Sequence, residues 1–439
     1  MSKKIVICCD GTNNEPVKGA STNVWRLFCA SVEDAGQVKW YDAGVGTTPR
    51  MTKPSVGKFI GALLKSVVTF QWWKAAGAIA GHIVGSKVDW DRVKDLAAGV
   101  TLRENVWDAY RYLMSVYEPG DKVYLFGFSR GAFTARVLAG MIHGVGVLKR
   151  GRENLLPYAW DAYLGLKSEV RPGRMRKLYL TLFGDSKAEE AKAKAEFVKF
   201  KERVAEFKAS ASHQATVGFV GVWDTVSSVG MYNMNDTFPF TLNNPSVERL
   251  RHAVSIDERR AGFRTNLFTA DETPQTDGAP RVKNVWFPGA HCDVGGGYDW
   301  PGESGLAMRA MEWMAEEARV AGMHVDGARM ADYHAQCPPN ALGKAHDELA
   351  QSLGWKFMEL LPAYRYDWAK EVKEWRWRPK KPRDVVERPA KKSEEEKKAR
   401  LHASVFERVQ GDASYRPENL GPAFDMDALR SRFQEETRA

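Results

Sequence analysis

KVYLFGFSRGA, residues 122–132, is the stretch of sequence that decides the fold. Its first part is rich in β-branched and aromatic residues, which favours a buried strand, and a run of helix formers follows it. Ser129 therefore lies on a sharp turn between a strand and a helix, with Gly127 and Gly131 at positions where only glycine fits. Such a nucleophile elbow pushes the serine Oγ out of the sheet, within reach of a histidine and a substrate carbonyl. The motif predicts acyl transfer through a serine ester.

The segments on either side of the motif indicate the class of fold. Residues 105–117 have the apolar spacing of an amphipathic helix, which Pro119 and Gly120 end. Residues 130–142 carry apolar side chains at helical spacing. Helix, strand, elbow, helix is the order of a doubly wound sheet, so we expect an α/β-hydrolase-like fold with a mostly parallel sheet and helices on both faces. The alternative to a nucleophile is a structural serine in a glycine-lined turn.

Length and composition limit the other possibilities. The chain has 439 residues, of which 44% are hydrophobic, enough for one large α/β domain with insertions or for two domains. No apolar stretch is long enough to cross a membrane, and Lys3 and Lys4 lead into a strand rather than a signal peptide. We therefore expect cytoplasmic synthesis without a cleaved signal. The five cysteines show no CxxC spacing, which favours a reducing compartment over a disulfide framework.

An apolar insertion interrupts the alternation of strands and helices. We assign the catalytic domain to residues 1–50 and 100–320, and the insertion to residues 51–99. The insertion is rich in glycine and contains Trp72 and Trp73. It is either a segment that packs on the sheet or a lid or membrane-contact element, because paired tryptophans suit a lipid interface.

Two further segments depart from the alternation. Residues 175–212 are a helical excursion, rich in alanine, lysine and glutamate with aromatic residues on one stripe. Residues 321–439 form a charged C-terminal extension with a basic arm at 370–400, which indicates an extended arm or a poorly ordered connector. The formal net charge of the chain is +9. The arm is either a solvated face or a contact for an anionic partner such as lipid headgroups, and we expect no nucleic-acid binding.

A serine nucleophile needs a base and an acid, and in an α/β-hydrolase both follow it in the chain, the acid first. His291 is the best base, because it follows an apolar strand and opens a glycine-rich loop. Asp224 closes the apolar strand at 216–223, a position from which a carboxylate reaches the loop of a neighbouring strand. Asp293 is a weaker rival for the acid and is better placed to brace the histidine loop.

The oxyanion of the tetrahedral intermediate requires two preorganised donors. The backbone N–H of Arg130, next after the nucleophile, is one by geometry. The second is expected from the loop after the first strand, where the backbone N–H groups of Gly11 and Thr12 are the best available. Asp10 either supports that function directly or only caps and staples the loop. The Arg130 side chain is expected to pair with an acid near the site, because a charge is out of place on a core helix.

Two other chemistries fit less well. A strand followed by DGT at 10–12 is typical of phosphatases with an aspartyl nucleophile, but these carry a further aspartate where this chain has Cys8. The sequence HCD at 291–293 offers too few ligands for a hydrolytic metal. We therefore expect neither a metal nor a cofactor.

Blocks of sequence that follow one another along the chain resemble those of a known family. They are CDGTNNEP at 9–16, YDAGVGT at 41–47, the run at 104–142, VWDTVSSVG at 222–230, WFPGAHCDVGGGY at 286–298 and YRPENL at 415–420. They are similar to the α/β-hydrolase family of uncharacterised bacterial and fungal domains that also contains the family 1 lipase effectors of type VI secretion. The resemblance implies Ser129 as nucleophile, Asp224 as acid and His291 as base, acting on a glycerophospholipid or another lipid ester. The large membrane modules typical of the secreted effectors have no counterpart here, so the resemblance extends to the chemistry rather than to a toxin role.

These observations together predict a serine ester hydrolase of phospholipase or lipase type that works through an acyl-enzyme. Its partners are a lipid or other acyl-ester substrate and, at the periphery, a membrane, and export by a signal-independent secretion system is consistent with the resemblance. Two alternatives stay open: a small-molecule esterase or thioesterase, and a catalytically degenerate binding or regulatory protein that keeps the hydrolase fold. The oligomeric state is not predicted.

Overall fold

We describe the fold from a computed structural model of the chain. The described residues are 2–11, 21–44, 90–167, 186–226, 228–229, 232–233, 238–260, 263, 265–351, 363–367, 372–376, 383–387, 398–422 and 424–437. Thr12, Trp72 and Trp73 lie outside them, and of the predicted insertion at 51–99 only the last residues are described. The proposed lid or membrane-contact role of the insertion therefore stays a prediction.

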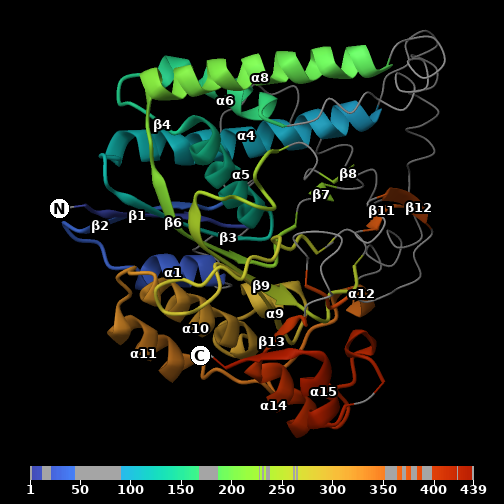
Figure 1. The fold of residues 1–439 in the computed structure, drawn as a ribbon. Helices are drawn as coiled ribbons and strands as arrows, with labels where there is room; N and C mark the ends of the chain where they lie inside the picture. The colour runs from blue at the N-terminus through green and yellow to red at the C-terminus, as the bar shows by residue number, and fades with distance from the viewer. Residues whose placement is uncertain are drawn as a thin grey trace, which may run out of the picture.

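Within the described part of the chain, eight strands form one sheet at the centre of the molecule (Figure 1). They are β1 (Lys4–Cys9), β2 (Gln37–Asp42), β3 (Lys122–Phe128), β6 (Thr216–Trp223), β9 (Val247–Ser255), β10 (Val282–Phe287), β13 (Arg400–His402) and β14 (Gln434–Glu436). Their order is β14-β13-β10-β9-β6-β3-β1-β2, and every neighbouring pair is parallel. The α/β class expected from the elbow and its flanking helices is confirmed.

The strands are apolar on both sides because both faces of the sheet are covered. In β1, Ile5 and Ile7 pack in one hydrophobic core, whereas Val6 and Cys8 pack in the other. β3 and β6 alternate between the same two cores. The near-continuous apolar runs in the sequence are the consequence of this two-sided burial.

Helices cover both faces of the sheet, as expected (Figure 1). One face carries α4 (Trp90–Val116), α5 (Arg130–Val145), α6 (Leu156–Gly165) and α8 (Ser186–Ala211), and the other carries α1 (Asn23–Ala30), α10 (Gly305–Val320) and α11 (Gly327–Gln336). α4 begins at Trp90, so its first turns belong to the segment predicted as an insertion. α8 lies within the predicted excursion at 175–212.

The remaining described elements are short. They are the antiparallel pairs β4 (Val147–Leu148) with β5 (Ser212–His213), β7 (Ser228–Val229) with β8 (Tyr232–Asn233) and β11 (Ala363–Asp367) with β12 (Val372–Arg376), the helices α9 (His291–Gly295), α12 (Glu348–Gln351), α14 (Ala403–Gly411) and α15 (Met426–Arg432), and 3-10 turns at Glu153–Leu155 and Glu418–Leu420. β12 and residues 383–387 fall in the predicted basic arm.

The end of the chain extends the sheet. β13 pairs with β10, and β14 pairs with β13. Trp286 of β10, Leu401 of β13 and Leu429 of α15 share a third hydrophobic cluster beneath this edge. The sheet therefore continues beyond residue 320, where the sequence analysis ended the catalytic domain. Three-residue strands such as β13 and β14 are too short for periodicity to mark them in a sequence.

The strand order creates a topological switch point at the carboxyl ends of the strands. β1 lies between β2 and β3, so the chain leaves β1 toward one side and returns on the other. At such a switch point the loops after neighbouring strands diverge at their carboxyl ends, where α/β proteins bind ligands. Asp10 and Gly11 follow β1, and Ser129 follows β3, at this same edge.

Neither a membrane span nor a metal cluster is found in the part of the chain that the structure describes. No helix there is long and apolar enough to cross a membrane. No group of three or more histidine, cysteine, aspartate or glutamate side chains among these residues is arranged to hold a metal ion.

Candidate active site

Ser129 stands at the turn between β3 and α5 with a strained backbone. Its φ of 57° and ψ of −120° are rare for a residue other than glycine. Its N–H donates to Trp223 O at 3.1 Å, and its carbonyl accepts from Val226 N at 3.2 Å. These bonds tie the elbow to the loop after β6, which carries Asp224. Backbone strain that its surroundings enforce is typical of functional positions.

Gly127 and Gly131 leave no room for a side chain. A Cβ atom on Gly127 would lie 2.4 Å from Gly131 O, and a Cβ atom on Gly131 would lie 2.1 Å from Cys9 O and 2.4 Å from Asp10 O. All three obstacles are backbone atoms, which cannot swing aside. The tight turn from β3 into α5 therefore explains Gly127, and the close approach of α5 to the end of β1 explains Gly131.

Asp224 and His291 come from the ends of different strands, and their side chains meet. His291 Nδ1 lies 2.5 Å from Asp224 Oδ2. Both residues are buried, with 1% of Asp224 and 4% of His291 exposed. The other oxygen, Asp224 Oδ1, accepts from the N–H of Ser255 at 3.0 Å and from its hydroxyl at 3.1 Å. The structure thus pairs the acid and the base that were chosen from the sequence, and their catalytic roles stay a prediction.

A third side chain that sequence reasoning missed also binds Asp224. Arg383 Nη1 donates to Asp224 Oδ1 at 2.5 Å, and Nη2 donates to Oδ2 at 3.1 Å. Burial favours a higher pKa for Asp224, but the charge of Arg383 and the hydrogen bond with His291 hold that pKa well below its usual range. Arg383 itself is 5% exposed. At Arg383, therefore, the predicted arm is neither a solvated face nor a contact for an external anionic partner, because its charge is neutralised by a buried carboxylate.

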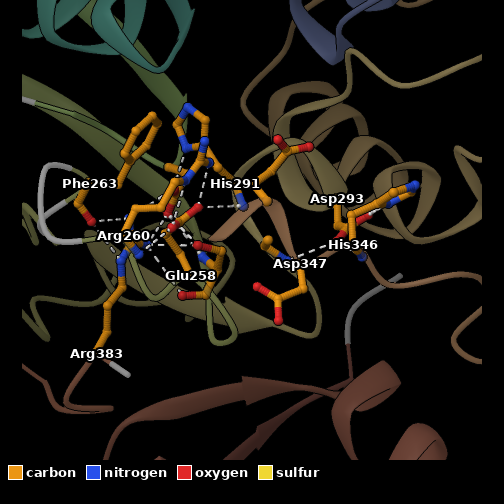
Figure 2. Close-up of polar contacts among 12 residues, drawn as sticks. Glu258, Arg260, Phe263, His291, Asp293, His346, Asp347 and Arg383 are labelled. Atoms are coloured by element: carbon orange, nitrogen blue, oxygen red, sulfur yellow. Dashed lines mark hydrogen bonds and ion pairs between the residues drawn. The ribbon is translucent and has the colours of Figure 1, made fainter. Parts of the chain in front are cut away.

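The imidazole of His291 is held between two aromatic rings. The ring centroid of Phe128, the residue before Ser129, lies 4.6 Å away, and that of Phe263 lies 4.8 Å away with the planes at 74°. Figure 2 shows Phe263 beside His291. The backbone N–H of His291 donates to Glu258 Oε2 at 3.4 Å. Packing and hydrogen bonding therefore hold the His291 ring next to Phe128, the residue before Ser129.

Asp293, the weaker rival for the acid, braces the histidine loop instead. Its Oδ2 accepts from Ala290 N and from His346 N, both at 2.9 Å, and its Oδ1 lies 2.7 Å from His346 Nδ1. Figure 2 shows Asp293 and His346 together, away from His291. Asp293 thus supports the turn that begins α9, the alternative role that the sequence allowed.

Asp10 staples the loop after β1. Its carboxylate accepts from the N–H of Gly11 at 2.6 Å, from the hydroxyl of Thr22 at 2.5 Å and from the hydroxyl of Tyr41 at 2.7 Å. The N–H of Gly11, predicted as an oxyanion donor, is therefore engaged by Asp10 in this structure. Thr12 lies outside the described residues, so the second oxyanion donor stays a prediction.

Arg130 combines two features at the start of α5. Its backbone N–H belongs to the first turn, where N–H groups have no partner within the helix. Its half-buried side chain has its pKa lowered by burial. The sequence analysis expected an acid to pair with this guanidinium, but none of the described acidic residues does so. A cation beside Ser129 is thus left for a ligand or for a residue beyond the described ones.

The C-terminal YRPENL block fixes the loops that carry the site. The hydroxyl of Tyr415 donates to Asp257 Oδ2 at 3.0 Å, and the amide of Asn419 donates to Ile256 O at 2.9 Å and to Arg383 O at 3.0 Å. The block stood out in the sequence only through its resemblance to the hydrolase family. No local pattern could have indicated Arg383, which lies 159 residues from Asp224 in the chain.

Comparison with known proteins places the chain in a family. Residues 3–317 match the family described as "T6SS, Phospholipase effector Tle1-like, catalytic domain". A yeast protein, "Uncharacterized protein YEL023C" of Saccharomyces cerevisiae, is 31% identical over 269 residues, which cover 61% of this chain and 33% of the yeast protein. The chain thus matches only a third of that relative's length.

Two solved structures are also similar. An uncharacterized protein from Pseudomonas aeruginosa is 19% identical with a TM-score of 0.39, over 81% of this chain and 50% of that one. The Tle1 effector bound to the VgrG spike from the Type 6 secretion system is 18% identical with a TM-score of 0.30, over 70% of this chain and 53% of that one. Both similarities are too low to support an argument, whereas the family match covers well over half of the chain. The chain therefore belongs to the Tle1-like family of phospholipase effector catalytic domains.

Proposed function

We propose that the protein is a serine hydrolase that cleaves acyl esters of phospholipids through Ser129, His291 and Asp224. The observation that carries the proposal is the buried bond between His291 Nδ1 and Asp224 Oδ2 at 2.5 Å, next to the strained elbow of Ser129. A carboxylate in this position fixes the tautomer of the imidazole so that Nε2 can accept a proton. Membership of a family of phospholipase catalytic domains supports the lipid substrate.

The proposed reaction has two steps that share one base. In the first, His291 Nε2 takes the proton of the Ser129 hydroxyl while Oγ attacks the ester carbonyl. The tetrahedral intermediate collapses, the bond from the acyl carbon to the alcohol oxygen breaks, and His291 returns the proton to the departing lysophospholipid. In the second, His291 Nε2 takes a proton from a water molecule whose oxygen attacks the acyl carbon. The bond from the acyl carbon to Ser129 Oγ then breaks, the fatty acid leaves, and His291 returns the proton to Oγ.

The negative oxygen of each intermediate requires donors near Ser129. The backbone N–H of Arg130 is the first, because the start of α5 offers N–H groups without helical partners. Gly11 or Thr12 is the proposed second donor, and Gly11 would have to exchange its hydrogen bond with Asp10 for one with the substrate. The Arg130 guanidinium, half-buried beside the nucleophile, supports a substrate with a negative charge near its ester.

Substitution of Ser129 by alanine tests the proposal. The S129A variant should release no fatty acid from phospholipid vesicles or from p-nitrophenyl esters and should not react with a fluorophosphonate probe. Ser115→Ala, which removes an exposed hydroxyl from α4, is the matched control and should behave as the unmodified protein. Unchanged turnover in S129A would refute the assignment of the nucleophile.

Two alternatives predict different results in the same assays. A small-molecule esterase or thioesterase would prefer short acyl chains and show no increase in rate above the critical micelle concentration. A degenerate hydrolase fold would fail to react with the fluorophosphonate at Ser129. Because the family contains type VI secretion effectors, we also propose export of the protein, which its detection in the culture medium of secreting cells would test.

A further inference from the structure

Arg383 makes an unusually complete set of contacts for a residue in a charged segment. Besides its two bonds to Asp224, its Nη1 donates to Ser255 Oγ at 2.7 Å. Its Nε and Nη2 donate to Phe263 O at 3.0 and 2.6 Å. Figure 2 shows Arg383 reaching toward Phe263. Every nitrogen of the guanidinium therefore has a partner, and all the partners lie at the carboxyl ends of the strands or in the loops that follow them.

The contacts of Arg383 restrain the carboxylate of Asp224. Oδ1 accepts hydrogen bonds from Arg383 and Ser255, and Oδ2 accepts one from Arg383 and pairs with His291 Nδ1. A planar guanidinium that binds both oxygens fixes the plane of the carboxylate, which a single hydrogen bond from His291 does not. A buried ion pair adds little net stability even when its geometry is complete, because the cost of desolvation offsets the attraction. Its place beside the triad therefore points to a role other than stability.

We propose that Arg383 is a positioning residue of the triad, which orients the Asp224 carboxylate toward His291 and places a fixed positive charge beside it. The inference rests on the proposed function of Ser129, His291 and Asp224. It adds a fourth residue that touches neither the substrate nor the reacting atoms and acts through Asp224.

The C-terminal part of the chain holds Arg383 in place. Asn419 Nδ2 donates to Arg383 O at 3.0 Å and to Ile256 O at 2.9 Å. Glu387, at the end of the same described segment, accepts from Asn284 Nδ2 at 2.6 Å. The segment 383–387 is thus anchored at both ends to the sheet, and we infer that assembly of the triad requires it.

The charges around His291 determine the sign of the effect on pH dependence. Asp224 and Glu258 are the carboxylates that contact His291, and Arg260 pairs with Glu258 at 2.7 Å. Arg383 Nη2 and His291 Nδ1 lie 3.1 and 2.5 Å from the same oxygen of Asp224, so the guanidinium is close to the imidazole. Its positive charge opposes a second positive charge on the ring.

The experiment compares Arg383→Gln, Arg383→Lys and the unmodified protein in kcat and KM across pH. We expect R383Q to lower kcat about 10- to 100-fold with little change in KM, because the acid is misplaced rather than the substrate. The acid limb of kcat/KM should move to higher pH, because a positive charge beside the imidazole is removed. R383K should keep the acid limb near its original pH but recover only part of kcat, because an ammonium cannot bind both oxygens in one plane.

A matched control separates positioning from general loss of packing. Arg281 is also buried and ion-paired, with Asp271 at 2.7 Å, but lies at the start of β10, at the opposite edge of the sheet. Arg281→Gln should lower the melting temperature without moving the acid limb. If R383Q is too unstable to assay, Asn419→Ala, which removes the hydrogen bonds to Arg383 O and Ile256 O but keeps the guanidinium, should lower kcat in the same direction.

The outcomes distinguish this inference from the function on which it rests. If the unmodified protein hydrolyses esters, S129A does not, and R383Q has the same pH profile as the unmodified protein, the positioning role is refuted and the proposed function stands. If S129A is as active as the unmodified protein, the proposed function itself fails. A shift of the acid limb in R383Q alone, absent in R281Q, supports the positioning role.

Discussion

Replacing Asp224 by asparagine should remove the negative charge beside His291 and one of the two acceptor oxygens of the carboxylate. The described partners of the Asp224 side chain, Ser255, Arg383 and His291, are all donors when His291 carries its proton on Nδ1. An amide offers one acceptor oxygen and one NH2 donor. The NH2 group must therefore face a donor, either on the side of Ser255 or on the side of His291. If the NH2 group faces His291, the proton moves to Nε2, and the ring can no longer accept the proton of Ser129.

The magnitude follows from two separate losses. A wrong histidine tautomer lowers kcat by about 10⁴-fold when the acid of a triad becomes an amide. The same substitution leaves the buried guanidinium of Arg383 without a counter-charge, which costs about 3 to 5 kcal/mol of stability. We therefore expect D224N to be almost inactive and clearly destabilised, whereas S129A should be inactive and about as stable as the unmodified protein.

The assay pairs ester hydrolysis with urea unfolding, and Asp293→Asn serves as the control. Asp293 is equally buried and also bonds a histidine, but it braces the loop rather than His291. D293N should lose less than about 10-fold in kcat, since only hydrogen bonds of the loop are weakened. The reasoning is refuted if D224N retains more than a tenth of the original kcat, or if D293N loses as much as D224N.

Three further predictions concern the elbow, a buried acid and the substrate. Gly131→Ala should abolish activity and lower stability by several kcal/mol, because its Cβ would lie 2.1 Å from Cys9 O; normal kinetics in G131A would contradict the steric argument. Burial raises the pKa of Asp257 to about 6 from 3.8, so the stability associated with its protonated form is complete below pH 3.8 and is lost as the pH rises through 6. Asp257→Asn should therefore stabilise the protein at pH 8 by about 1 to 3 kcal/mol and by less at pH 5, as measured by urea unfolding, and an equal gain at both pH values would argue against it. Arg130→Gln should lower kcat/KM about 10-fold for anionic phospholipid but little for a neutral p-nitrophenyl ester; an equal loss on both substrates would exclude a role in binding the charge.

The local sequence pattern alone was sufficient to predict the central elements of the fold. Strand β3, the elbow and helix α5 follow one another with apolar residues at the period of each element and glycine where the backbones touch. The apolar runs of β1 and β6 revealed strands covered on both faces. These features are readable because periodicity and glycine placement record whether a residue faces the core or a neighbouring backbone, which are properties of short segments.

The choice between neighbouring polar residues was decided only by packing. The sequence offered Asp224 and Asp293 as acids, and the structure joins Asp224 to His291 and Asp293 to His346. It offered Asp10 as part of an oxyanion loop or as its staple, and the carboxylate binds Gly11, Thr22 and Tyr41.

The last strands and Arg383 show where local pattern fails altogether. Three-residue strands carry no period, and an arginine among lysines and prolines resembles any solvated charge. Asp224 and Arg383 are 159 residues apart, and they meet because the C-terminal segment returns across the carboxyl ends of the strands. The sequence by itself determined the elbow, the class of sheet and the candidate triad, whereas the tertiary structure alone decided what surrounds the acid, because an ion pair between distant segments depends on how whole layers pack.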